Sequence, residues 1–512
     1  MRLGFAAAAA LIVLATAGAT VGVGMVQLHQ VTTTLRKFGH TEAFRPGTIT
    51  APPAGKPQTI LLVGSDRRFG DPSGTAHSDT MLLVRLDPRQ QATTMMSVPR
   101  DLAVEIPGHG LSKINAAYGE GGLDLTVRTL KDLLSTPGHP FKINHAIAVN
   151  FKGFREAVSV VHCVYVDVDR RYYHSNAGVP IGQRYAEIDV QPGYQRLCGQ
   201  RALSYVRFRH ADNDLVRAAR QQDFLRAAGD ELSTSSILGH LQRVVKAFAR
   251  ATSSDANLQS ATGILRLLHL AAGLAGHPVR QVRFPATLVN SPVAPVTTNG
   301  ITTTTATGLG DYVTATPDQI HRAVQRFLHP PAVKRITRAP TGHKTSHRKK
   351  AAPPTPADYG LVYAFSQAKA LVKPQLRAHR LRIPLYAPRW LTPRGRYPAS
   401  TSIAPMPRIY SVADRSGHQH QAYRLVLEEN VTEGQYYGIQ GVAWPDPPIL
   451  QAASTTLKMG KRTFELFYDG QHLRVVAWRT AKAAYWVSNT LTRSLSNREM
   501  LGIARSLTRV RR

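Results

Sequence analysis

The chain has 512 residues, 43% of them hydrophobic, which is enough to bury more than one core and favours two domains with connecting segments. Its 64 Lys and Arg residues against 32 Asp and Glu residues give a formal net charge of +32, which indicates an anionic partner: nucleic acid, phospholipid headgroups or a phosphate-rich polymer. Its two cysteines exclude the ligand spacings of a cysteine-based zinc site.

The N-terminal segment is apolar. After Arg2 the stretch "LGFAAAAALIVLATAGATVGVGMVQL" runs for more than twenty residues without a charge, which is long enough to cross a bilayer. The "ATA" at 15–17 permits cleavage by a signal peptidase, but the apolar run continues past it. We predict an uncleaved transmembrane anchor over residues 1–28, with a cleaved export signal as the alternative.

The next segments predict a stalk and a sheet. Residues 29–57 are polar and carry Pro and Gly ("RPGTITAPPAGKPQ"), which is typical of an extracytoplasmic stalk. Continuous apolar runs at 59–64 ("TILLVG"), 80–86 ("TMLLVRL") and 93–98 ("TTMMSV") predict buried strands. The segment "LSYVRFRH" at 203–210 predicts a further strand.

Helical patterns interleave with these strands. Apolar residues at three- and four-residue spacing predict helices at 123–134, after Asp214, at 237–249 and at 318–328. Residues 58–330 therefore predict an α/β domain in which helices cover a central sheet.

A linker and a second domain follow. Residues 331–357 contain many Lys, Arg, Pro and Thr and predict a basic, Pro-rich linker. In residues 358–512, alternating segments ("RTFELFY", "HLRVVAW", "AAYWVSN"), an Asp-Gly turn at 469–470 and a capping box from Ser496 to Glu499 predict a smaller α+β domain with an antiparallel sheet. An alternative role for residues 331–512 is a noncatalytic module that binds anionic wall polymers.

Charged residues stand at the predicted strand ends of the first domain. Asp66 follows the first strand, Asp79 directly precedes the second, and Arg100 and Asp101 follow the third. Loops at strand ends gather ligands in open α/β sheets, and two carboxylates hold Mg²⁺ when phosphate oxygens and waters complete its octahedron. Singly these aspartates are typical turn or cap residues, but together with the arginines they resemble a phosphoryl-transfer site.

A second cluster, "RFRHADNDLVRAARQQD", occupies residues 207–223. A helix starting at Asp214 places Arg217 and Gln221 on one side with Arg220 beside them. Guanidinium groups held together repel one another unless an anion lies between them, and their planar forks match phosphate oxygens. The alternative is a solvated basic helix with local aspartate pairs.

The segments "LLVGSDRR", "HSDTMLLVRL", "SVPRDLAVEIPG", "KINAAY" and "CGQRALSYVRFRHADNDLVRAARQQ" resemble the LytR-CpsA-Psr family over roughly residues 58–330. The resemblance implies a membrane-anchored enzyme that moves a glycopolymer from a polyprenyl-pyrophosphate carrier onto peptidoglycan. It implies Mg²⁺ ligands at Asp66 and Asp79, pyrophosphate binding by Arg100, Arg207, Arg209, Arg217 and Gln221, and supporting contacts from Arg68 and Arg220.

One position departs from the family pattern. His77 stands directly before the Ser-Asp of "HSDT", where the family usually has an arginine. A histidine can still donate to a phosphate, but its charge depends on pH, so we expect weaker binding of the pyrophosphate near neutral pH. Asn115, in "KINAAY", is expected to begin a helix and to have a structural role.

Cys163 and Cys198 both lie in the first domain. Export would place them in an oxidising compartment, where a disulfide would close a loop of about 35 residues and stabilise the fold by roughly 3 kcal/mol. Two buried thiols are the alternative.

The predicted function is phosphoryl transfer at the outer face of the plasma membrane, with both main domains extracytoplasmic. The prenyl chain requires an apolar groove, which we expect near the helices at 125–134 and 237–249. A lipid-pyrophosphate hydrolase with water as acceptor is one alternative. A membrane-linked transcriptional regulator is another, but no DNA-reading helix is evident, and we expect no nucleic-acid partner.

Overall fold

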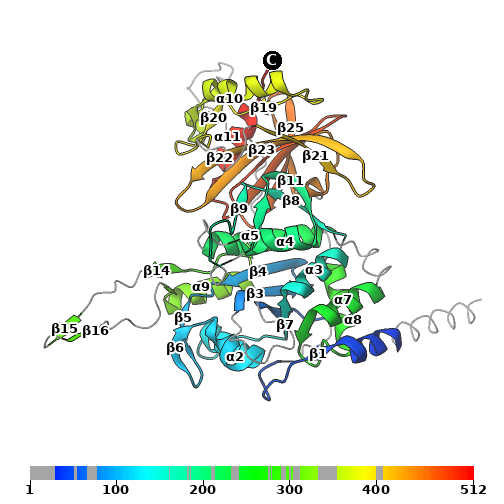
Figure 1. The fold of residues 1–512 in the computed structure, drawn as a ribbon, viewed down its shortest axis with the longest axis vertical. Coiled ribbons are helices and arrows are strands. Elements are labelled where there is room, and N and C mark those ends of the chain that lie inside the picture. The colour runs from blue at the N-terminus through cyan, green and yellow to red at the C-terminus, as the bar shows by residue number, and fades with distance from the viewer. Residues whose placement is uncertain are drawn as a thin grey trace, which may run out of the picture.

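The computed structural model contains two seven-stranded sheets, stacked along the long axis of the molecule (Figure 1). The first lies within residues 40–282 and the second within residues 408–488. The structure describes residues 29–50, 55–65, 78–160, 162–180, 184, 186–208, 214–231, 241–274, 277, 279–289, 296–298, 301–303, 312–331, 354–398, 407–451 and 453–511.

The first sheet is mixed, because its three central strands are antiparallel to one another, while the strand on each side of this group runs parallel to the central strand that it pairs with. The central strands confirm the three predicted apolar strands. In spatial order the sheet consists of β1 (His40–Thr41), β12 (Thr252–Ser254), β7 (His145–Asn150), β2 (Gln58–Ser65), β3 (Ser78–Asp87), β4 (Ala92–Val98) and β13 (Val279–Val282).

Helices cover both faces of this sheet, as the α/β pattern predicts. Leu61 and its alternate neighbours pack against α2 (Ala116–Leu134) and α9 (Pro317–Leu328). Ile60, on the other face, packs with α8 (Ala261–Gly273). Successive side chains of a strand point to opposite faces, so neighbouring residues of β2 enter different cores.

The start of α2 contains two features of the "KINAAY" segment. Asn115 occupies the N-cap position, as expected, but its side chain makes no capping hydrogen bond. Gly121 and Gly122 interrupt the helix, and Gly122 has a φ of 60°, a left-handed conformation that glycine adopts at little cost.

A group of helices and short strands lies between the first sheet and the second domain (Figure 1). The predicted strand at 203–210 is wrong, because residues 203–207 belong to helix α4. The elements of this layer are α3 (Phe151–Val160), α4 (Gly199–Arg207), α5 (Asp214–Glu231), the antiparallel pair β8 (Val164–Val168) and β11 (Gly193–Leu197), and the antiparallel pair β9 (Tyr172–His174) and β10 (Ile188–Val190).

Further elements extend the first domain. Helix α7 (Leu241–Ala251) lies beside α3 and β12, and a hairpin joins β5 (Ala103–Ile106) to β6 (Gly110–Lys113). Two short antiparallel pairs follow α8: β14 (Thr287–Val289) with β17 (Tyr312–Thr314), and β15 (Val296–Thr298) with β16 (Ile301–Thr303).

The second domain has an antiparallel sheet with helices on one face, as predicted. Helices α10 (Phe365–Ala378) and α11 (Asn497–Ser506) pack on that face, and the predicted capping box of Ser496 and Glu499 is present. In spatial order the sheet is β21 (Arg408–Ala413), β22 (Gln419–Asn430), β23 (Gln435–Val442), β27 (Ala484–Ser488), β26 (His472–Arg479), β25 (Arg462–Asp469) and β24 (Thr455–Met459).

Short elements complete the second domain. These are η2 (Ala357–Tyr359), η3 (Pro448–Leu450), the pair β18 (Val362–Tyr363) with β20 (Trp390–Leu391), and the pair β19 (Tyr386–Ala387) with β28 (Thr508–Arg509).

Helix α5 joins the two domains through buried ion pairs. Asp469 of the second domain lies 3.0 Å from Nη2 of Arg226 and 3.3 Å from Nε of Arg493. Asp223 of α5 accepts hydrogen bonds from both of these arginines and, at 3.1 Å, from Gln281. Burial alone would raise the pKa of Asp223, but the positive charges of Arg493 and Arg226 outweigh burial and lower it.

A second buried contact holds β8 against the sheet of the second domain. The Asp167 carboxylate accepts hydrogen bonds from Nη1 of Arg424, at 2.8 Å, and from Nε1 of Trp486, at 2.9 Å. Arg424 is fully buried, so removing its partner would leave an uncompensated charge. Tyr165 and Tyr194 of the β8–β11 pair belong to one apolar cluster with residues of the second sheet.

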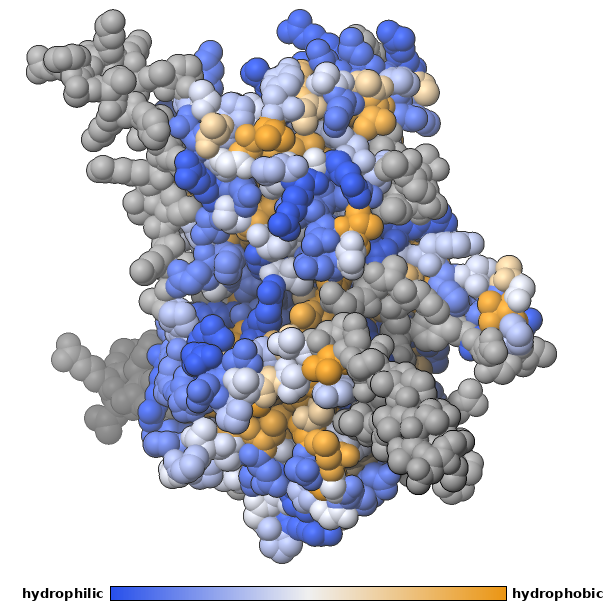
Figure 2. Space-filling model, turned by 90° about the vertical axis from the view of Figure 1, so that its left-hand side faces the viewer, coloured by the Kyte–Doolittle hydropathy of each residue, from blue (hydrophilic) through white to orange (hydrophobic). Residues whose placement is uncertain are grey.

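Hydrophilic residues cover most of the described surface in Figure 2, and hydrophobic residues form small separate groups there. Among the described residues, helices that combine the length and the hydropathy required to span a bilayer are absent. The predicted anchor at residues 1–28 lies outside the described residues.

Candidate functional site

The ends of four strands of the first sheet meet at one edge. Ser65, at the end of β2, pairs with Ser78 of β3 and with Asn150 of β7, while Val98, at the end of β4, pairs with Met81 of β3. The same edge of the sheet therefore holds the last residues of β2, β4 and β7 and the first residue of β3.

Three of the predicted site positions are close in sequence to these strand ends. Asp66 follows Ser65 directly, Asp79 follows Ser78 within β3, and Arg100 comes two residues after Val98. Nε of Arg100 lies 3.3 Å from the Asp101 carboxylate, which Lys113 also approaches at 3.3 Å. The structure describes Asp79 by its backbone alone, and Asp66, Arg68, His77 and Arg209 lie outside the described residues.

A cavity of about 150 Å³ lies between this edge and the helices α3, α4 and α5. Apolar side chains form most of its lining. It is lined by Leu62, Val63, Gly64, Thr80, Leu82, Val149, Asn150, Phe151, Phe154, Leu203, Val206, Arg207, Arg217, Gln221, Phe224 and Leu225.

The cavity brings together residues far apart in the sequence. Arg207, Arg217 and Gln221 line the same cavity as Gly64 and Thr80, which are each close in sequence to one of the predicted metal ligands. Among the described residues, part of the late arginine cluster therefore lies at one cavity with residues near the early strand ends. The roles of the predicted site residues stay a prediction.

The cavity does not lie where the apolar groove was predicted. Neither α2 nor α7 contributes a lining residue to the cavity, although they cover the described parts of the predicted segments 125–134 and 237–249. Leu125 and Leu130 of α2 pack into the core on the opposite face of the sheet with Leu61, whereas Leu62 lines the cavity.

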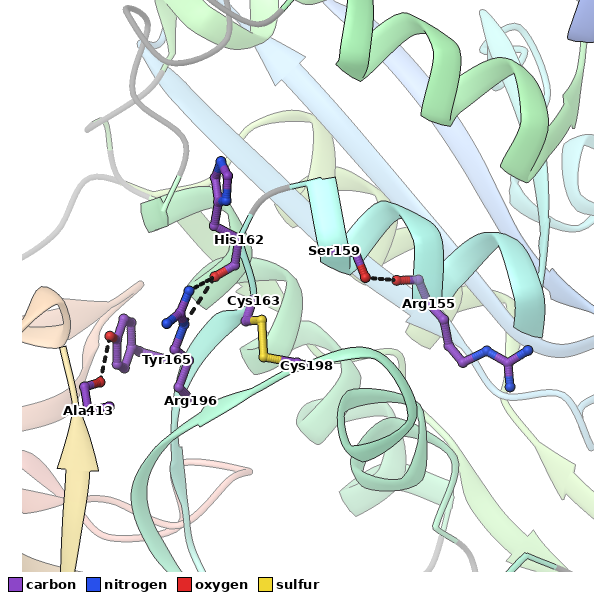
Figure 3. The surroundings of a disulfide bond; sticks show 8 residues. All are labelled: Arg155, Ser159, His162, Cys163, Tyr165, Arg196, Cys198 and Ala413. Carbon is purple, nitrogen blue, oxygen red and sulfur yellow. Dashed lines mark hydrogen bonds between the residues drawn. A yellow bond between two sulfur atoms is a disulfide. The ribbon is translucent and has the colours of Figure 1, made fainter. Parts of the chain in front are cut away.

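Helix α4 places Arg207 at the cavity and is fixed at both ends. Its N-cap is Cys198, which forms a disulfide with Cys163, so the predicted disulfide is confirmed (Figure 3). At the other end Nε2 of Gln221 donates to the carbonyl of Val206 at 3.1 Å. The guanidinium of Arg207, the last residue of α4, lies 5.2 Å from the ring centre of Phe151.

The turn that carries Cys163 is unusual. His162 and Cys163 have φ values of 58° and 70°, a left-handed conformation that costs energy in residues other than glycine. Nε and Nη2 of Arg196 donate to the carbonyl of His162 at 3.1 and 2.7 Å, which stabilises the turn (Figure 3).

Helix α5 divides its basic residues between the cavity and the core. Arg217 is buried in the wall of the cavity. Arg220 is instead fully buried among aromatic side chains. Its guanidinium carbon lies 4.6 Å from the ring centre of Tyr172 and 5.8 Å from that of Tyr205. Its guanidinium group also donates a hydrogen bond to the carbonyl of Phe208. Its position is therefore behind the cavity wall.

The chemistry of the strand ends fits a hard cation. Carboxylates at positions 66 and 79 would supply oxygen ligands, and each position directly follows one member of the Ser65–Ser78 pair in the sequence. Among the described residues, clusters of three or more His, Cys, Asp or Glu with the geometry to hold a metal are absent. The Mg²⁺ site stays a prediction.

Some cavity residues escaped the sequence analysis. Phe151 and Phe154 of α3 and Asn150 at the end of β7 were not singled out. The signal was present: "HAIAVN" at 145–150 contains the continuous apolar run "AIAV", as the three predicted strands contain apolar runs.

The family model for the LytR_cpsA_psr family matches residues 26–307, more than half of the chain, and the chain belongs to this family. It is 31% identical over 210 residues to the polyisoprenyl-teichoic acid–peptidoglycan teichoic acid transferase TagT of Bacillus subtilis (strain 168), a match covering 40% of this chain and 62% of TagT. It is 31% identical over 214 residues to TagU of Oceanobacillus iheyensis, covering 40% of this chain and 61% of TagU. The matches thus span about three fifths of these relatives.

Among solved structures, the crystal structure of Bacillus subtilis TagV is similar with a TM-score of 0.41 and 24% identity, covering 54% of this chain and 98% of that chain.

Proposed function

We propose that the chain transfers a glycopolymer from a polyprenyl-pyrophosphate carrier to a hydroxyl group of peptidoglycan. The observation that carries this proposal is an apolar cavity with two arginines and a glutamine in its wall, beside the strand ends that bear the predicted carboxylates. Such a lining suits an amphiphile with a long apolar chain and an anionic head. Family membership and the teichoic acid transferase activity for which the relative TagT is named support the same reaction.

The residues of the chain have distinct roles in this reaction. The prenyl chain lies among the phenylalanine and leucine side chains of the cavity, and Arg207 and Arg217 bind the pyrophosphate oxygens. The attacking hydroxyl forms a new bond to the sugar-proximal phosphorus and releases its proton to solvent as the bond to the bridging oxygen breaks. Polyprenyl phosphate leaves with the electron pair of that bond. Fixed guanidinium groups stabilise the charge that develops on this leaving group.

Mg²⁺, held by Asp66 and Asp79, would supply further neutralisation of the phosphate oxygens when bound. Arg100 stands at the same edge, two residues beyond β4, where it can reach a phosphate bound there. Arg220 supports the site from behind, because its bond to the Phe208 carbonyl ties α5 to the end of α4.

We further propose that residues 1–28 anchor the chain and that both domains lie outside the cytoplasm. The disulfide between Cys163 and Cys198 supports this placement, because disulfides persist mainly in oxidising compartments.

The test uses a prenyl-pyrophosphate-linked glycan, a muropeptide acceptor and Mg²⁺. Replacing Arg207 by Ala should lower the rate of transfer by roughly 10²–10³-fold, the range for loss of one fixed group that stabilises transition-state charge. Arg155→Ala is the matched control, because Arg155 is exposed on α3 and bonds to Gln200. Its rate should stay within about twofold of the wild-type rate.

Two outcomes would contradict the proposal. Release of free glycan phosphate without transfer to the muropeptide would indicate a hydrolase. Unfolding of the Arg207→Ala protein in a thermal melt, with Arg155→Ala intact, would show that Arg207 holds the fold instead of the substrate.

A further inference from the structure

The helix at residues 29–38 directly follows the apolar N-terminal stretch and is fixed to the first domain. Val31 and Leu35 on its inner side are buried against Val245 and Ala249 of α7 and Ile264 of α8. Figure 1 shows this helix (blue) beside α7 and α8. Under the proposal that residues 1–28 anchor the chain, this part of the domain surface follows the anchor directly in the sequence.

The outer side of the same packing is strongly basic. The ring centre of Phe38 lies 4.1 Å from the guanidinium carbon of Arg250 and 5.5 and 5.8 Å from the ammonium nitrogens of Lys37 and Lys246. All three cations are exposed. An aromatic ring thus stands at the centre of three positive charges, within the range of cation–π attraction.

The basic residues line two neighbouring surface hollows of about 380 and 470 Å³. Lys37 and Phe38 belong to both. Lys152 and Arg250 complete the basic lining of the first hollow, and Arg243 and Lys246 that of the second. Among the described residues that line them, Glu156 is the one acidic side chain.

The pattern of α7 explains this arrangement. Arg243, Lys246 and Arg250 recur at three- and four-residue spacing, so they form one stripe, while Val245 and Ala249 face inward. Cations gathered on one surface repel one another, and a multivalent anionic surface removes that repulsion. Amphipathic elements with Lys and Arg beside an aromatic side chain lie in the headgroup region of membranes.

We propose that Lys37, Lys152, Arg243, Lys246 and Arg250, arranged around Phe38, form a juxtamembrane surface that binds the headgroups of anionic phospholipids. This surface would fix the orientation of the first domain on the bilayer. It is separate from the cavity of the proposed transferase, since the two share no lining residue, so either proposal can fail without the other.

The experiment titrates the full chain in neutral detergent with dihexanoyl phosphatidylglycerol and, in parallel, with dihexanoyl phosphatidylcholine. Selective binding of the anionic lipid is expected, weakening as salt rises from 50 to 500 mM, conditions chosen to vary screening. The charge reversal Lys246→Glu/Arg250→Glu should weaken that binding by at least about tenfold, since each cation near an anionic surface contributes about fivefold.

The matched control reverses two exposed cations of α10, Lys369→Glu/Lys373→Glu, in the second domain. It has the same change in net charge and should bind the lipid as the wild type does. The milder Lys246→Gln/Arg250→Gln variant replaces the reversal if a thermal melt shows that the reversal unfolds the protein.

Three results would overturn the proposal. The first is equal binding of the two lipids, and the second is equal loss of lipid binding in both charge-reversal variants. The third is a soluble poly(glycerol phosphate) that binds at this surface while phosphatidylglycerol does not, which would assign the surface to a polymer instead of a bilayer.

Discussion

The two charged faces of helix α5 differ in how their charges are used. On one face Arg217 and Gln221 lie among apolar side chains at the wall of a cavity. On the other, Asp223 and Arg226 meet Arg493 and Asp469 in a buried network that joins the two domains.

The comparison separates two roles of arginine in one helix. Carboxylates matched to guanidiniums across a domain boundary fix the relative position of the domains, whereas cations facing a cavity can receive an anionic ligand. Reading the helix as one basic run obscures this difference, because Arg217 and Arg226 look alike in the sequence.

The largest expected effect follows removal of the disulfide that holds α4, the helix that carries Arg207, at the cavity. Replacing both Cys163 and Cys198 by Ser should lower the free energy of unfolding by roughly 3–4 kcal/mol, because the unfolded chain regains the freedom of a loop of about 35 residues. Urea unfolding at pH 7 measures the loss. A variant as stable as the wild type would show that the pairing contributes nothing to holding α4.

On the interface face, Asp469→Asn should lower the free energy of unfolding by about 3 kcal/mol, because Arg226 and Arg493 would share the one carboxylate of Asp223. The matched control is Asp446→Asn, which removes a mostly exposed partner of Arg479 in the same domain and should cost less than about 1 kcal/mol. If urea unfolding showed the same loss of stability for Asp469→Asn and Asp446→Asn, the conclusion that the interface charges fix the two domains together would be wrong.

Neighbouring glutamines of α5 offer a finer comparison. Gln222→Ala removes a buried hydrogen bond of 2.8 Å to Ser97 and should cost about 1–2 kcal/mol of stability with a smaller effect on transfer. Gln221→Ala should lower the transfer rate more than Gln222→Ala does and the stability less, since Gln221 lines the cavity. Paired measurements of melting temperature and transfer rate decide this. If the loss of transfer rate relative to the loss of melting temperature were the same in both variants, the two faces of α5 would be equivalent.

The smallest expected effect is a dependence of stability on pH. The pKa of Asp223 is lowered in the folded chain, so its contribution is fully present above the unfolded value of about 3.9 and is lost as pH falls through the folded value. Each unit of pKa difference corresponds to about 1.4 kcal/mol. Asp223→Asn should therefore lose less stability than the wild type between pH 5 and pH 2, as measured by urea unfolding. If the stabilities of the variant and the wild type fell in parallel with pH, Asp223 would not contribute to the pH dependence.

The sequence predicted the strands and most helices because their apolar residues follow clear periods. It failed at α4, where the five consecutive residues Ala202–Val206 are all buried. A helix buried on every side shows no alternation, and its β-branched and aromatic residues then favour a strand. The capping box of α11 could be predicted because Ser496 and Glu499 are three residues apart. The disulfide could be predicted because the chain has two cysteines, so a single pairing is possible.

The cavity and the domain interface could not be predicted from local patterns. The cavity position depends on which face of β2 each helix covers, and α2 proved to cover the other one. The contact of Asp167 with Arg424 joins residues 257 positions apart, for which a single sequence gives no signal. Likewise the separation of Arg220 from Arg217 depends on the aromatic side chains supplied by α4 and β9.

Tyr165 and Tyr194 are buried by residues of the second sheet, which are synthesised later than the two tyrosines. During synthesis these rings leave the ribosome long before residues 408–488 exist, and at typical elongation rates the delay is on the order of tens of seconds. Throughout that interval the nascent first half exposes an apolar surface with no cover.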